Sequence, residues 1–214
     1  MPYKHPNLRD QREAISWARK VIKDKHKYLI LDTETTGISN KDEIIEMSVI
    51  DLDGNCLLGS RFLPIKRKSI PKDATAVHGI SYAMLKDCPR FSDFDRELRS
   101  AIGSKDIIAY NADYDMRLYK QTCLIAYQYE GRQTFAPKGD WYCAMLEYAK
   151  FVGDWNAHHN NYRWQKLENH SDTADHTSYG DCLATLEVIR KMSNARMQKS
   201  WHEFWKFWIK DESK

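Results

Sequence analysis

The clearest strand signal of the chain lies in residues 28–37, which read Tyr-Leu-Ile-Leu-Asp-Thr-Glu-Thr-Thr-Gly. The first four residues are apolar on both faces of an extended chain, as in a central strand covered on two sides. Asp32 and Glu34 follow where this strand ends, before a turn at Gly37. Because residues i and i+2 of a strand point to the same side, both carboxylates project together from one rigid element.

The pair Asp32 and Glu34 admits two interpretations. Two carboxylates about 5–7 Å apart at the edge of a core repel each other unless a cation neutralises them. A hard divalent metal with oxygen ligands is one answer. The other is that the strand has ended and both side chains are solvated turn residues. This pair alone favours neither.

The sequence around this stretch predicts an α/β fold, a mixed sheet with helices packed on it. Residues 43–51 and 56–63 flank Asp53-Gly54, a strong hairpin signal, and residues 106–110 form another strand. Residues 153–175 are polar and predict a loop with one short helix at about 164–167. Helices are expected over about 8–25, 82–87, 93–101, 114–127, 142–151 and 178–192, with Ser81 and Ser92 as N-caps of the second and third.

Composition bounds the class of protein. The 214 residues are 42% hydrophobic and 29% charged with a formal net charge of +3, which suits one soluble domain with appendages. No apolar run approaches the length of a membrane span, and the first thirty residues lack a signal sequence. The five cysteines form no C-x-x-C pair, which indicates free thiols rather than a zinc ribbon or a disulfide framework. We therefore expect a cytoplasmic protein with no membrane partner.

Two further segments carry acidic residues in suggestive places. Asp115 lies in Asn111-Ala-Asp-Tyr-Asp, directly after the strand at 106–110. An acid at this position also stabilises a helix N-terminus, so it needs no catalytic role to explain it. Asp181 ends the segment His176-Thr-Ser-Tyr-Gly-Asp, and Ser178-x-x-Asp181 is also a capping-box pattern. His176 and Asp181 approach one cleft only if His176 precedes the helix, because five residues turn a helix by about 500°.

Taken together, these segments resemble the DEDDh family of 3′–5′ exonucleases, the DnaQ-like enzymes with an RNase H-like fold. The resemblance rests on Asp32-Thr-Glu-Thr-Thr-Gly37, Val77-His-Gly-Ile-Ser81 and the later acidic segments, and it covers residues 27–192. It implies a mixed five-stranded sheet flanked by helices, with extra N- and C-terminal helices. The expected organisation is a helical extension at 1–26, an exonuclease domain at 27–193 and an aromatic-rich helix at 194–214.

The resemblance also implies roles for individual residues. Asp32, Glu34, Asp115 and Asp181 become the ligands of two divalent ions, Mg²⁺ or Mn²⁺, and His176 becomes the general base that takes a proton from water. The implied substrate-binding residues are Thr35, Thr36, Gly37, His78 and Asn111. The sequence departs from the family at Tyr110, where histidine is common, and at Ser178, where alanine is common.

The implied activity is metal-dependent release of nucleoside 5′-monophosphates from the single-stranded 3′ ends of nucleic acid, with DNA as the expected substrate. One alternative is an RNase of the same family that trims RNA 3′ ends, since no residue can be assigned to contacts with the 2′-OH. Another is a catalytically inactive nucleic-acid-binding or polymerase-associated module, against which the complete set of five residues argues.

The C-terminal segment carries Trp201, Phe204, Trp205 and Trp208 at helical spacing, which forms one apolar face. We expect this face to pack within the chain, against the leading helix that carries Trp17. The alternatives are a docking surface for a second subunit or another protein, and base stacking. Four histidines between 158 and 176 match no zinc-ligand spacing and predict a polar loop.

Overall fold

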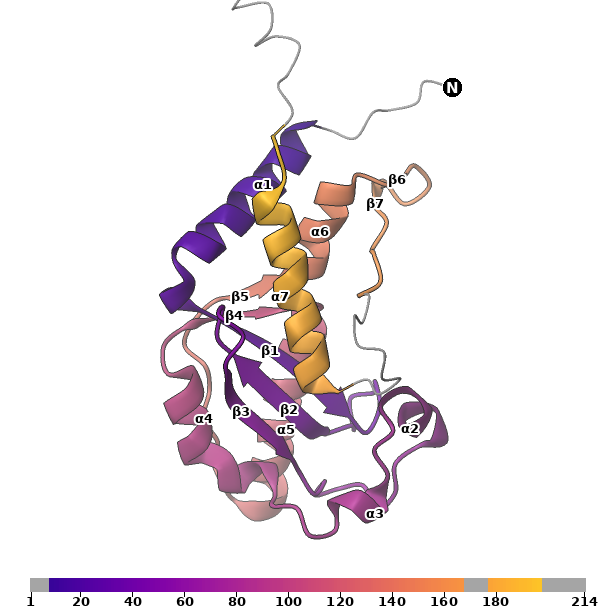
Figure 1. Ribbon diagram of the computed structural model, residues 1–214. Coiled ribbons are helices and arrows are strands. Elements are labelled where there is room, and N and C mark those ends of the chain that lie inside the picture. The colour runs from indigo at the N-terminus through magenta and orange to yellow at the C-terminus, as the bar shows by residue number, and fades with distance from the viewer. Residues whose placement is uncertain (1–7, 168–176, 198–214) are drawn as a thin grey trace, which may run out of the picture.

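The computed structural model describes residues 8–167 and 177–197, which form a sheet between two helical layers (Figure 1). The sheet has five strands in the order β3-β2-β1-β4-β5, so the segment at 28–35 lies at its centre. β1 runs antiparallel to β2 and parallel to β4. The strands are β1 (Tyr28–Thr35), β2 (Ile44–Ile50), β3 (Cys56–Arg61), β4 (Asp106–Ala109) and β5 (Trp141–Cys143).

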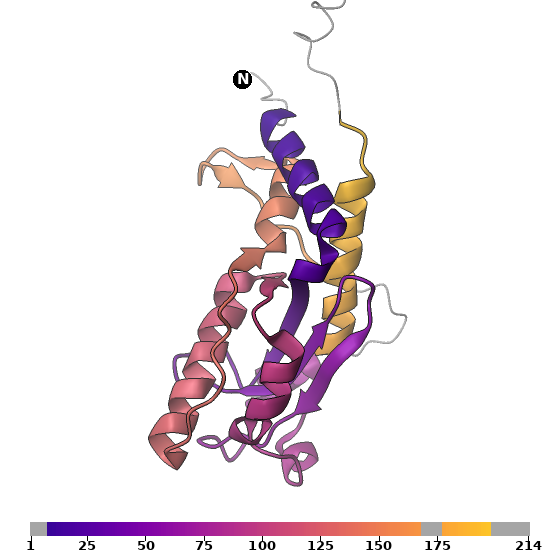
Figure 2. The same cartoon turned by 90° about the vertical axis from the view of Figure 1, so that its left-hand side faces the viewer.

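Helices cover both faces of this sheet, as the side view shows (Figure 2). One face carries α1 (Leu8–Lys23), α6 (Ala144–Val152) and α7 (Ser178–Asn194), and the other carries α4 (Asp95–Ile102) and α5 (Ala112–Glu130). The remaining elements are α2 (Lys72–His78), α3 (Tyr82–Leu85), the 3-10 turns η1 (Lys25–Lys27) and η2 (Phe91–Phe94), and a small hairpin of β6 (Trp155–Asn156) and β7 (Asn161–Tyr162).

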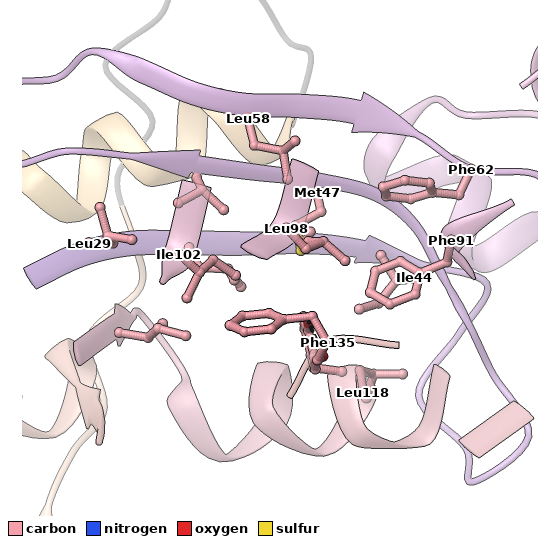
Figure 3. Packing of buried hydrophobic residues seen from close by; sticks show 14 residues of the cluster. Leu29, Ile44, Met47, Leu58, Phe62, Phe91, Leu98, Ile102, Leu118 and Phe135 are labelled. Atoms are coloured by element: carbon pink, nitrogen blue, oxygen red, sulfur yellow. Dashed lines mark hydrogen bonds between the residues drawn. The ribbon is translucent and has the colours of Figure 1, made fainter. Parts of the chain in front are cut away.

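Side chains of β1 point alternately to the two faces of the sheet, and the core is divided into two clusters accordingly. Leu29 and Leu31 pack with residues of α4 and α5. Figure 3 shows this cluster and labels Leu29, Leu98, Ile102, Leu118 and Phe135 among its members. Ile30 points to the opposite face and packs with residues of α1 and α7. The side chains of Asp32 and Glu34 point to the same side of β1 as that of Ile30, because side chains alternate along a strand. They therefore lie on the face that α7 covers.

The predicted mixed five-stranded sheet flanked by helices is confirmed. The hairpin predicted around Asp53-Gly54 is present as β2 and β3, and the helices predicted at 8–25 and 178–192 are present as α1 and α7. None of the described helices is long and apolar enough to cross a membrane.

Four local expectations were wrong or incomplete. Tyr142 and Cys143, expected to begin the helix at about 142–151, belong to β5 instead, because the backbone of Trp141–Cys143 pairs with β4 from Ile107 onward. Residues 164–167 are not helical, and the carbonyl of Gln165 accepts a hydrogen bond from Tyr110 at 2.7 Å. The polar stretch at 153–175 contains the β6–β7 hairpin, and α2 had no sequence signal. Ser92 is no N-cap, since α4 starts at Asp95.

The start of β5 depends on a close approach between two backbones, at Gly139. A Cβ at this position would overlap the carbonyl of Lys105, just before β4. We expect Gly139→Ala to lower the free energy of unfolding by about 1–3 kcal/mol, because backbone on both sides must shift. Gly59→Ala is the matched control, since its Cβ would meet only ordinary contacts at 3.4 Å or more. Urea denaturation measures both, and equal stability of the two variants would contradict this account.

Candidate active site

Three of the predicted acidic residues meet at the end of β1. Asp32 and Glu34 come from β1, and Asp181 comes from the first turn of α7. One carboxylate oxygen of each lies within 4.8 Å of the others. They meet because α7 packs on the sheet face to which the even-numbered residues of β1 point. Oxygen donors in this arrangement suit a hard divalent cation.

Asp115 reaches the same site from the opposite face of the sheet. It lies in the first turn of α5, is 3% exposed, and accepts a hydrogen bond from the Thr33 hydroxyl at 2.8 Å. Thr33 is the residue of β1 between Asp32 and Glu34, so a single strand supports acids on both faces. All four acids line one pocket of about 350 Å³, together with Thr33, Val77, Tyr110, Asn111, Tyr114, Lys166 and Leu167.

The carboxylates of the site resist ionisation when no cation is present. Burial, with the neighbouring charges of Asp115 and Asp181, raises the pKa of Asp32 well above its usual range. Burial, followed by the charge of Asp181, raises the pKa of Glu34 to about 8. Burial also raises the pKa of Asp115 to about 7, although the bond from Thr33 opposes this. A bound cation removes this cost, so the donor set fits a divalent metal.

The start of α7 is anchored to β2. The side chain of Thr177 caps the helix by accepting from the Gly180 N–H at 3.1 Å. Ser178 instead turns inward: its N–H and its hydroxyl donate to Oε1 of Glu46 at 3.0 and 3.1 Å. Its hydroxyl also lies 2.8 Å from that of Ser48. Ser178 is therefore not the cap of a capping box with Asp181, and that structural explanation of Asp181 is wrong.

Glu46 is a site-forming residue that the sequence analysis missed. It stands opposite Glu34 in the β1–β2 register, is 6% exposed, and accepts through Oε2 from Nε of Arg61 at 2.6 Å. The ion pair with Arg61 offsets a charge that would otherwise lie unpaired beside the metal-site acids. An acidic residue within the apolar run 43–51 was the available signal.

The turn after β1 is held by its own side chains. The hydroxyl of Thr35 donates to the Gly37 carbonyl at 2.9 Å, and that of Thr36 donates to Asp42 at 2.9 Å. Gly37 has a φ of +151°, and a Cβ there would lie 2.9 Å from an Asp42 oxygen. The predicted substrate-binding segment thus uses both hydroxyls to shape the turn.

Of the other predicted site residues, Asn111 lines the pocket and His78 is not among the lining residues. Asn111 is the N-cap of α5. His78 ends α2 and is 7% exposed, and its Nδ1 accepts from the Ile80 N–H at 3.0 Å. His176, the predicted general base, lies outside the described residues, immediately before Thr177 in the sequence.

The raised pKa of Glu34 predicts how pH changes the stability of the metal-free protein. Because the folded state holds this proton more tightly than the unfolded state, the stabilisation is full below about pH 4.5 and lost as the pH rises through about 8. In EDTA at pH 8.5, Glu34→Gln should therefore exceed wild type in free energy of unfolding by about 1–3 kcal/mol. At pH 5 the difference should be small. Urea denaturation at both values tests this.

Glu97→Gln, at a surface ion pair with Arg96, is the matched control and should change stability little at either pH. A metal-free wild-type protein that gains stability between pH 5 and 8.5 relative to Glu34→Gln would refute the account of the charge cluster.

Removal of Glu46 tests the anchor of α7. Glu46→Ala should lower the free energy of unfolding by about 2–3 kcal/mol, because it leaves the buried Ser178 N–H without its acceptor. Glu46→Gln keeps an acceptor oxygen and should lose less. Glu13→Ala removes an exposed carboxylate paired with Arg9 and serves as the control. Urea denaturation showing equal losses for Glu46→Ala and Glu13→Ala would exclude the anchor.

Comparisons with known proteins agree with this geometry. The family model described as Exonuclease (RNase_T) matches residues 29–189. An uncharacterised exonuclease, CP81 of Escherichia phage 186, is 33% identical over 180 residues, which cover 80% of this chain and 90% of the phage protein. The DNA polymerase III subunit epsilon of Buchnera aphidicola subsp. Schizaphis graminum is 28% identical over 108 residues, covering 47% of this chain and 46% of that subunit.

Among solved structures, the zinc-bound complex of Escherichia coli exonuclease I with single-stranded DNA superposes with a TM-score of 0.56 at 17% identity. The match covers 78% of this chain and 41% of exonuclease I, so it shows the fold alone. The family match over residues 29–189 and the phage relative carry the assignment: the chain belongs to the DEDDh, DnaQ-like family of 3′–5′ exonucleases.

Proposed function

We propose that this protein removes nucleoside 5′-monophosphates from the 3′ ends of single-stranded DNA in a reaction that depends on two divalent ions. One observation carries the proposal: four carboxylates from β1, α5 and α7, elements far apart in the sequence, line a single pocket. Their order along the chain is that of the family's acidic set.

Asp32, Glu34, Asp115 and Asp181 are the residues that would hold the ions, Mg²⁺ or Mn²⁺. Four carboxylates offset the four positive charges of two such ions. Burial, with the neighbouring charges, raises the pKa of Asp32, Glu34 and Asp115 when no cation is bound. When bound, paired ions stabilise the charge that develops on the attacking and leaving oxygens of a phosphodiester.

His176 is the general base in this proposal. A neutral imidazole with a pKa in its ordinary range takes a proton from the attacking water near neutral pH. Lys166, which lines the pocket and is exposed, offers an ammonium group to the phosphate backbone of the strand. The terminal nucleotide would be surrounded by Thr35, Thr36, Gly37, His78 and Asn111. The first three would contact it through the backbone of their turn.

DNA is the proposed substrate because two relatives point to it. One is a DNA polymerase III subunit and the other is an exonuclease bound to single-stranded DNA, although this chain spans less than half of each. Five free cysteines support action in the reducing cytoplasm. A second subunit or a protein partner on the aromatic segment 194–214 stays a prediction, and residues 198–214 lie outside the described part.

The test uses purified protein with matched 5′-labelled single-stranded DNA and RNA in Mg²⁺, Mn²⁺ or EDTA. We expect a ladder that shortens from the 3′ end, faster on DNA, and no cleavage in EDTA. His176→Ala should lower turnover by about 10²–10⁴-fold, the usual effect of losing a general base. Asp32→Ala should abolish both activity and calorimetric binding of Mn²⁺.

His158→Ala is the matched control, because this exposed histidine lies in the neighbouring polar segment, and it should cleave as wild type does. Full activity of His176→Ala would remove that residue from the mechanism. Faster cleavage of RNA would replace DNA processing with RNA trimming. Bound Mn²⁺ without cleavage of either strand would favour the inactive binding module.

A further inference from the structure

A second and larger cavity lies beside the active-site pocket. Its volume is about 930 Å³, at the upper end of the range for pockets that bind small organic groups. The first turn of α5, the helix α6, the β6–β7 hairpin and Trp17 of α1 form its walls. We call this cavity the aromatic groove, because its lining includes Trp17, Trp141, Tyr142, Trp155, Tyr162 and Trp164.

The groove is continuous with the active site along one segment of chain. Trp164 lines the groove, whereas Lys166 and Leu167 line the active-site pocket. Gln165, between them, is held by the bond from Tyr110 at 2.7 Å. On the other wall, Ala112 lines the groove and Asn111 lines the pocket. A polymer whose end occupies the pocket can therefore continue into the groove.

The aromatic surface is held rigidly in place. Trp155 and Tyr162 pack edge to face across the hairpin, with ring centroids 5.1 Å apart. The Tyr162 hydroxyl donates to Asp10 of α1 at 2.6 Å, and the Arg163 N–H donates to the Asp154 carbonyl at 2.8 Å. Trp164 follows this braced hairpin and is 64% exposed, so its ring has a free face.

The aromatic lining and its continuity with the active-site pocket identify the partner that this surface fits. The charges of the groove are of both signs, because Asp113, Glu147 and Lys150 line it and Lys150 is paired with Glu147. Residues 162–166 read Tyr-Arg-Trp-Gln-Lys, with aromatic and basic side chains interleaved. Arg163, Trp164 and Lys166 are all exposed. Single-stranded nucleic acid is bound in this way, by cations along the phosphates and aromatic rings under the bases. Arg163 is paired with Asp154 at 3.6 Å, and Lys166 lines the active-site pocket, not the groove.

We propose that the aromatic groove stacks bases of the substrate strand upstream of its 3′-terminal nucleotide, with Trp164 as the main stacking residue. The proposal rests on the proposed function, since it needs a strand whose 3′ end lies at Asp32 and Glu34. The groove would then determine the affinity for the strand, whereas the carboxylate pocket would carry out the hydrolysis.

The test compares Trp164→Ala with wild type on an oligothymidylate of about twelve nucleotides. Stacking predicts a KM about 5–150-fold higher for the variant, with kcat little changed. An oligonucleotide with abasic positions upstream of the last nucleotide should raise the KM of wild type by a similar factor, and Trp164→Ala should add little to that. Tyr127→Ala is the matched control, because this ring is 55% exposed but lies about 22 Å along α5 from Ala112.

A third substrate separates failure of the proposed exonuclease function from failure of the groove proposal. The p-nitrophenyl ester of thymidine 5′-monophosphate is too short to reach the groove, so its cleavage by wild type tests the carboxylate pocket alone. Cleavage of this ester together with equal KM values of wild type and Trp164→Ala on the oligonucleotide would overturn the groove proposal only. A lower KM in Trp164→Ala would also overturn it, because another occupant, such as residues 198–214 or a protein, would then compete for the groove.

Discussion

The burial of mutually repelling carboxylates at the end of one central strand is the constraint on which the rest of the structure depends. Asp32, Glu34 and Asp181 crowd within 4.8 Å, and Asp115 lies behind the same strand. Such a cluster costs stability in the metal-free protein, so the surrounding fold must hold it against that cost. The buried β1, with β2 and β4 as its neighbours, supplies a rigid base that cannot relax outward.

The network around Glu46 shows how the fold holds the cluster. Glu46 binds the start of α7 through Ser178 and is itself neutralised by Arg61. Ser178 is one of the two departures from the family pattern, and its hydroxyl contacts that of Ser48 where α7 packs on β2. Tyr110, the other departure, ties down the segment that carries Lys166 into the pocket. Both departures therefore act on the positions of site elements and leave the four acids unchanged.

The acidic pocket would carry out hydrolysis, and the aromatic groove would bind the rest of the strand. The acidic pocket is small, and a cation must offset its charge before it can accept a phosphate. The groove beside it is larger and aromatic, and its charged residues are Asp113, Glu147 and Lys150. A strand that spans both would bind through its bases where the protein is apolar and through its phosphates where cations lie.

Local sequence determined the central strand, the β2–β3 hairpin and the position of Asp32 and Glu34 on one side of β1, because strand alternation and turn chemistry act over a few residues. The same local rules left Asp115 and Asp181 with ordinary explanations as helix-end acids, and only the family resemblance joined them to the pair. An acid within the apolar run 43–51 marked Glu46 without revealing its partners, and β5 and the aromatic groove had no local signal that identified them. Their roles arise from contacts between segments distant in sequence, which only the packing of α7 and the hairpin against the sheet could decide.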